Sequence, residues 1–171
     1  MTPKQFKQLT KAEQRVAVAK DVLAQIKQER YVAKTSVYVE LSRSNEDLEE
    51  KPVKENIHKI KKCKVCAIGS TILSIAKFKN TIDFDDVTNG GFSQRADSLL
   101  GTVFGKKQLA LMEACFESLG SHPYARNTYN YTLPLEDRTK CINFYQDYRS
   151  QTDRLQAIMR NIIKNEGVFK P

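Results

Sequence analysis

The sequence predicts a mainly α-helical protein, a single compact helical domain of about six helices that can also hold a short two-stranded β pair. Three observations support this prediction. Apolar side chains recur at spacings of three and four residues in several separate stretches, as they do on one face of a helix. The 171 residues suit one domain better than two, because two domains would each have a thin core. Hydrophobic residues make up 40% of the chain and charged residues 28%, a globular composition that excludes collagen-like and wholly disordered chains.

The first predicted helix begins after Thr10. Thr10 and Glu13 form a capping-box pattern, in which each side chain can bond to the backbone amide of the other residue. The helix then continues to about Glu29, because an apolar stripe at helical spacing fills this stretch. The stripe consists of Val16, Ala19, Leu23 and Ile26.

Two segments of different character follow this helix. Residues 31–41 are rich in Tyr, Val and Thr, and the alternation of Val37 and Val39 with Tyr38 and Glu40 predicts a short strand. Residues 42–62 contain few apolar side chains and one proline, so we expect a flexible charged insertion there within the single domain of residues 1–171.

Residues 63–79 predict the central and most buried helix. The small side chains near its start, among them Gly69, permit a neighbouring element to approach closely. Cys63 and Cys66 form the beginning of this helix in the prediction. Its apolar face consists of Val65, Ile68, Ile72, Ile75 and Ala76.

The C-terminal half predicts three or four further helices. Ser93 can cap a helix that Gly105 separates from an apolar stretch over 106–118, so these residues form two helices or one bent helix. Residues 135–148 also look helical. The last helix has the clearest pattern and ends near Gly167, which favours a helix C-terminus. Its apolar stripe consists of Leu155, Ile158, Met159, Ile162 and Ile163.

The charge of the chain makes an acidic partner plausible. The 28 Lys and Arg against 20 Asp and Glu give a net charge of +8, in the range where nucleic acid becomes a candidate partner. Basic residues are nevertheless spread along the whole chain, and a charged run is usually a solvated face. The densest basic cluster, which is the nucleic-acid candidate, consists of Lys59, Lys61, Lys62 and Lys64.

The four cysteines are expected to be thiols, because a chain of this length can build a core without disulfides. Cys63 and Cys66 allow three interpretations. As zinc ligands they would need two more donors from His58, Cys115, His122 or Cys141, none of which pair at knuckle spacing. As a redox couple they would have a pKa lowered by the helix N-terminus and the neighbouring lysines. The interpretation that we favour is packing at the start of a buried helix, so we predict no metal and no cofactor.

No residue pattern names a reaction. The acidic stretch over 83–90 lacks the glycine and glutamate offsets of a calcium loop, so a turn or helix cap explains it better. Neither histidine lies in a recognisable triad order, and no glycine-rich phosphate loop is present.

A polar and aromatic connection over residues 120–134 is the predicted binding site. Tyrosine offers a large rigid face at low entropy cost, and Asn and Arg add directional hydrogen bonds. The same rings can stack on a nucleotide base, with Arg126 on a phosphate. The alternatives are a lid over the helices, or a strand in which Tyr129, Tyr131 and Leu133 pair with the earlier one. The predicted contact residues are Tyr124, Arg126, Asn127, Tyr129, Asn130 and Tyr131.

The order of these elements resembles a group of small bacterial and phage proteins. Residues 63–70 (Cys-Lys-Val-Cys-Ala-Ile-Gly-Ser) open a central helix, and residues 153–165 (Asp-Arg-Leu-Gln-Ala-Ile-Met-Arg-Asn-Ile-Ile-Lys-Asn) form a terminal one. The first stretch is similar to the Cys-Ala-x-Gly pattern of actinobacterial domains of unknown function. The resemblance covers about two thirds of the chain. It implies an origin in a phage or mobile element and transfers no activity.

The leading functional hypothesis is therefore a non-catalytic binding protein. As a phage accessory or anti-defence protein, it would hold a host protein or a small nucleotide through the tyrosine-rich connection. The first alternative is a basic nucleic-acid-binding protein. The second is an enzyme that gathers Cys63 or Cys66, a histidine and the acids of residues 83–86. The N-terminus shows no secretory signal and no stretch is long enough to span a membrane, so we expect a cytoplasmic location, the host cytoplasm for a phage protein.

Overall fold

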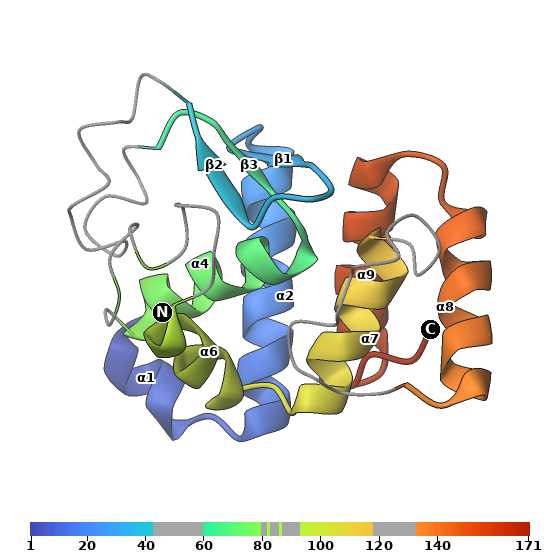
Figure 1. Ribbon diagram of the computed structural model, residues 1–171. Coiled ribbons are helices and arrows are strands. Elements are labelled where there is room, and N and C mark those ends of the chain that lie inside the picture. Colours follow the sequence, from blue (N-terminus) through green and yellow to red (C-terminus); the bar gives the residue numbers. More distant parts are fainter. Residues whose placement is uncertain (43–59, 80–81, 83–85, 87–92, 118–132) are drawn as a thin grey trace.

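The computed structural model describes residues 1–42, 60–79, 82, 86, 93–117 and 133–171 (Figure 1). Within this part of the chain, seven helices and a small three-stranded sheet confirm the predicted mainly α-helical fold. The helices are α1 (Pro3–Gln8), α2 (Lys11–Lys27), α4 (Ala67–Lys79), α6 (Gln94–Gly101), α7 (Lys106–Glu117), α8 (Leu135–Asp147) and α9 (Gln151–Lys164). The strands are β1 (Tyr31–Ala33), β2 (Val39–Leu41) and β3 (Cys63–Val65).

The caps of these helices follow the local sequence. The amide of Glu13 donates to the Thr10 hydroxyl over 3.3 Å, and the Thr10 amide donates to the Glu13 carboxylate over 2.8 Å. This reciprocal pair confirms the predicted capping box of α2. Helix α1, which we did not predict, has a second capping box of the same kind. It is anchored by Phe6, whose ring stacks on Phe78 of α4 with the ring centroids 4.8 Å apart.

The observed sheet contradicts two predictions, one about a strand and one about the start of a helix. The predicted strand over 31–41 is divided into β1 and β2 by a turn, and β3 lies between them, parallel to β1 and antiparallel to β2. The predicted central helix begins only at Ala67, because residues 63–65 form β3. In β3 the burial alternates, with Cys63 and Val65 inside and Lys64 outside, which is the period of a strand. The predicted pairing with Tyr129 and Tyr131 concerns residues outside the described part of the chain.

Helix α4 is the central helix of the fold, as predicted. Almost every residue from Ala67 to Phe78 is buried, and α4 packs against α1, α2, α6 and α7. The turn between β1 and β2 crosses its first turn at Gly69. A Cβ atom at this position would lie 1.7 Å from the carbonyl oxygen of Tyr38. Only glycine therefore lets the turn approach the helix backbone this closely.

The C-terminal helices form a second group beside α2, with α9 between α2 and α7 and with α8 on the outside (Figure 1). Helices α7 and α8 run parallel. The first turn of α7 is joined to the first turn of α8 by an ion pair between Lys107 and Asp137, whose Nζ and Oδ2 atoms are 2.8 Å apart. The chain therefore leaves α7 at one end of this helix pair and enters α8 at the other. No helix in the described ranges is both long and apolar enough to cross a membrane.

Candidate functional site

A group of polar side chains gathers where α7 ends, and we call it the polar junction. Helix α7 contributes its last residue, and the chain continues from there into residues 118–132. Helices α8 and α9 contribute one and two side chains, and the turn between β1 and β2 contributes two residues. The polar junction consists of Thr35, Ser36, Glu117, Tyr145, Gln151 and Arg154.

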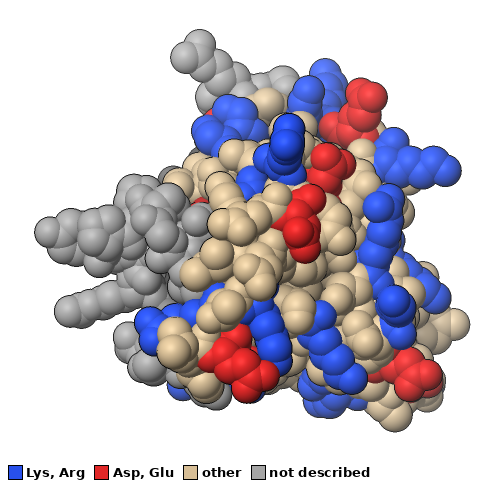
Figure 2. Space-filling view, turned by 90° about the vertical axis from the view of Figure 1, so that its right-hand side faces the viewer, with Lys and Arg blue, Asp and Glu red and all other residues tan. Residues whose placement is uncertain are grey.

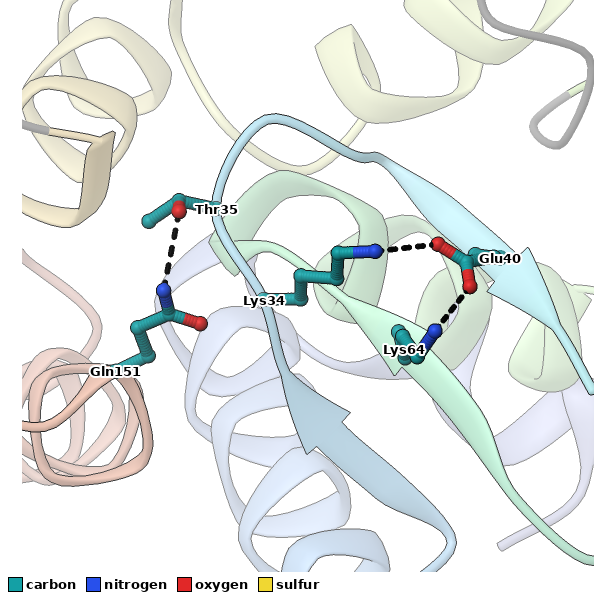
Figure 3. A network of polar contacts seen from close by, with 5 residues as sticks. All are labelled: Lys34, Thr35, Glu40, Lys64 and Gln151. Atoms are coloured by element: carbon teal, nitrogen blue, oxygen red, sulfur yellow. Dashed lines mark hydrogen bonds and ion pairs between the residues drawn. The ribbon is translucent and has the colours of Figure 1, made fainter.

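Three of the contacts that hold the turn in place involve Glu117, Gln151 and Gly69. The backbone amide of Ser36 donates to the Glu117 carboxylate over 2.8 Å. Ser36 adopts a φ of 63°, a left-handed conformation that costs a non-glycine residue free energy and persists only when its surroundings impose it. The Gln151 side-chain amide donates to the Thr35 hydroxyl over 3.1 Å, as Figure 3 shows. The close approach of the turn to Gly69 is the third contact.

Arg154 is the most unusual member of the polar junction. Its side chain lies on α9 and only 3% of its surface is exposed. The guanidinium carbon lies 3.8 Å from the centroid of the Tyr145 ring and 5.9 Å from that of Phe116. Within the described part of the chain, its Nε and Nη1 atoms have no hydrogen-bond acceptor and no ion pair includes it. A buried charge in this state costs free energy unless another group pairs with it.

Glu117 has an altered acidity. Burial raises the pKa of its carboxyl group to about 7, and the nearby Glu113 carboxylate raises it as well. The hydrogen bond from the Ser36 amide and the positive charge of Arg154 act in the opposite direction. At neutral pH this carboxyl group is therefore present in both protonation states, so the charge beside Arg154 depends on small changes in the surroundings.

The predicted binding residues of the tyrosine-rich connection lie outside the described residues. These are Tyr124, Arg126, Asn127, Tyr129, Asn130 and Tyr131, and they stay a prediction. What the structure adds is the position of the described residues on either side of them. Glu117 precedes this segment in the polar junction, and the buried Leu133 follows it before α8.

The surroundings of Cys63 and Cys66 contradict the redox interpretation. Burial raises the pKa of the Cys63 thiol to about 12, and burial together with the Glu117 carboxyl raises that of Cys66 well above its usual value. The predicted lowering by a helix N-terminus and lysines is wrong, because Cys63 lies in a strand and desolvation disfavours the thiolate. All four cysteines are free and buried, and the described residues contain no group of three metal-ligating side chains.

The predicted basic cluster is described at three of its four lysines. Lys64 points to the outer face of the sheet and is ion-paired with Glu40, which Lys34 also contacts over 2.8 Å (Figure 3). Lys61 and Lys62 are exposed, while Lys59 precedes the described stretch that starts at residue 60. On the face that Figure 2 shows, Lys and Arg side chains are scattered with acidic side chains among them.

The acids of the proposed enzyme alternative are described only at Asp86. Its carboxylate accepts a hydrogen bond from the Ser93 hydroxyl over 2.9 Å, next to the N-terminus of α6. The Arg95 guanidinium lies 3.6 Å from the same carboxylate. These contacts favour the helix-cap interpretation of this acidic stretch over a catalytic one.

A second polar group lies at one end of a groove along α2, whose volume is about 1360 Å³. The Asp21 carboxylate lies 2.5 Å from the Lys77 ammonium group and accepts a hydrogen bond from the Ser74 hydroxyl over 2.9 Å. Both oxygens of Asp21 are therefore occupied by side chains of α4. This arrangement joins α2 to α4 and engages the Asp21 carboxylate. The apolar walls of the groove include Leu9, Val16, Ala17, Phe78 and Ile163.

No protein-family model, curated protein sequence or solved structure matches this chain. The function must therefore be argued from the polar junction itself.

The sequence did contain one signal for the polar junction. Arg154 lies four residues before Ile158, so it occupies the apolar face of the last helix, where a charge is unexpected. Glu117 and Ser36 carry no comparable signal. Their hydrogen bond joins residues 81 positions apart in the chain.

Proposed function

We propose that this chain is a non-catalytic binding protein that holds its ligand with the tyrosine-rich connection over 120–134 and with the polar junction beside it. One observation carries the proposal. Glu117 is the last described residue before that segment, and its carboxylate accepts a hydrogen bond from the turn between β1 and β2. This turn is itself held by a hydrogen bond from Gln151 and by its close approach to Gly69. Binding loops are characteristically placed on such rigid supports.

A small nucleotide suits these groups better than the other ligand in the hypothesis, a host protein. The tyrosine rings offer stacking surfaces for a base, and arginine offers donors for a phosphate. A role as a phage accessory or anti-defence protein in the host cytoplasm is part of the same proposal and rests on the sequence resemblance alone.

The double substitution Tyr129→Ala and Tyr131→Ala tests this proposal. We expect it to abolish the capture of adenosine monophosphate in an equilibrium titration, because two stacking faces are lost. The melting temperature should change little, because the proposal assigns both rings to ligand contact and not to the core, and substitutions outside the core change stability by only about 0.5 kcal/mol or less. The control is Tyr129→Phe with Tyr131→Phe, which keeps both rings and should keep binding.

Two results would contradict the proposal. The alanine variant could lose its cooperative unfolding transition, which would show that these tyrosines belong to the core. It could also bind the nucleotide as well as the wild type does. Mass spectrometry of small molecules released from the purified protein would widen the search beyond the one probe.

The nucleic-acid alternative is favoured by one observation, the net charge of +8. It predicts that affinity for double-stranded DNA falls by orders of magnitude between low and moderate salt, because each phosphate contact releases counterions. A fluorescence titration of labelled DNA at several salt concentrations measures this slope. Substitution of the exposed Lys61 and Lys62 by Gln should reduce the slope. A flat salt dependence would remove this alternative.

A further inference from the structure

We infer that the polar junction binds an oxyanion, the phosphate or carboxylate group of a ligand, on the guanidinium group of Arg154. The inference rests on the proposed function in one respect: it takes the polar junction as part of the ligand site and identifies the chemical group that this site recognises.

The first step is the charge balance at Arg154. Arginine keeps its proton in proteins, so a positive charge sits at a position where only 3% of the side chain is exposed. No described carboxylate lies within ion-pair distance of this guanidinium. Glu117 affects it only through a longer-range electrostatic interaction, and the Glu117 carboxylate already accepts the Ser36 amide. Buried charges in folded proteins are usually paired, so this guanidinium is suited to bind an anion.

The second step is the direction of the unused donors. The guanidinium carbon lies 3.8 Å from the centroid of the Tyr145 ring, a cation–π contact that covers one face of the group. The N–H bonds of a guanidinium lie in its plane, so this contact satisfies none of them. Nε and Nη1 have no acceptor within the described chain. Oxygens of a phosphate or carboxylate are the acceptors that this planar donor group matches best.

The third step is access. Tyr145 is part-exposed, so the guanidinium lies one side chain below the surface. Gln151, one helical turn before Arg154 on α9, holds the 34–38 turn at the edge of the polar junction. The polar junction thus combines a preorganised cation, an aromatic ring and a fixed backbone turn.

Isothermal titration with inorganic phosphate and with acetate tests the inference. The titrations are made at a pH below the pKa of Glu117, so that its carboxyl group does not repel the anion, with chloride at matched ionic strength as the reference. We compare the wild type with Arg154→Met, which keeps an unbranched apolar stem and removes the charge. The matched control is Arg160→Met, which removes an exposed arginine from the same helix.

We expect saturable binding of at least one anion by the wild type and by Arg160→Met. Arg154→Met should bind about tenfold more weakly or not at all, because charge-assisted hydrogen bonds are lost. Tighter phosphate binding would indicate a phosphorylated ligand, and tighter acetate binding would indicate a carboxylate ligand. Equal binding by the wild type and Arg154→Met, or no saturable binding by the wild type, would overturn the inference.

A second variant and a second measurement keep the inference testable if Arg154→Met does not fold. Arg154→Lys keeps the charge but offers a point donor in place of the planar group, so phosphate should bind more weakly. In the wild type, the NMR signal of the Arg154 Nε–H group should move on addition of phosphate and stay unchanged with chloride. An NMR signal that stays unchanged with both ions would count against the site.

These results are separate from those for the tyrosine-rich connection. Phosphate binding that depends on Arg154, with nucleotide capture indifferent to Tyr129 and Tyr131, would remove the role of that segment and leave the anion site standing. Nucleotide capture that depends on the two tyrosines but not on Arg154 would remove the anion site and leave the role of the tyrosine-rich connection standing.

Discussion

Substitution of Gly69 by alanine is expected to lower the free energy of unfolding by about 3 kcal/mol or more. The added Cβ would lie 1.7 Å from the Tyr38 carbonyl oxygen and 2.5 Å from its carbonyl carbon. These are backbone atoms, so a rotamer change cannot relieve the contact, and either the turn or α4 must move. Urea unfolding followed by circular dichroism measures the effect. A loss of this size is a large part of the 5–15 kcal/mol or so that stabilises a typical domain.

The control for this prediction is Gly101→Ala at the end of α6, where an added Cβ meets no atom within 4 Å. Alanine there should be neutral or raise stability by about 0.5 kcal/mol, because it reduces the freedom of the unfolded chain. A Gly69→Ala variant as stable as Gly101→Ala would show that the turn does not rest on α4.

The Gly69 substitution also bears on function. A turn displaced from α4 would carry the Ser36 amide away from Glu117. The same variant should therefore weaken ligand binding at the polar junction even where enough folded protein remains for a titration.

Substitution of Ile158 by alanine is the second large effect that we expect, a loss of about 3 kcal/mol. Ile158 lies on α9, which packs against α2 and α7, and its side chain is fully buried. Removal of three carbon atoms loses their transfer free energy and leaves a cavity that the surrounding helices can fill only in part. The shift of the urea midpoint at unchanged slope reports the loss.

The matched control is Ile142→Ala on the outer helix α8, where 44% of the isoleucine is exposed. This change should alter stability by no more than about 0.5 kcal/mol. Equal losses for both isoleucines would contradict the packing of α9 between α2 and α7.

The helices were predicted where the signal is local. Thr10 and Glu13 identify the start of α2, and Ser93 identifies that of α6, because a cap bonds to an amide only three residues away. The stripe of α9 depends on spacing alone. Helix α1 was missed because it has six residues and one buried side chain, and its support, the stack of Phe6 on Phe78, joins distant parts of the chain.

The strand β3 marks the limit of this local information. Cys63 and Val65 are buried in either interpretation, as the first turn of a helix or as alternate residues of a strand. The decision comes from neighbours, since Cys63 aligns with Tyr31 on one side and with Leu41 on the other. Backbone hydrogen bonds to two separate strands outweigh the helical pattern, and the two thiols become buried side chains of the central strand and of a helix start instead of a redox pair.

The polar junction shows most clearly the difference between what local sequence specifies and what depends on tertiary contacts. By itself, the sequence determined most of the helical segments and placed an arginine on an apolar helix face, because periodicity and capping depend on residues within one or two turns. Only the tertiary structure decided that Arg154 is buried under Tyr145, that Glu117 meets Ser36 and that Lys64 is paired with Glu40. Burial and charge pairing depend on side chains far apart in the chain, and no local pattern specifies which of them will meet.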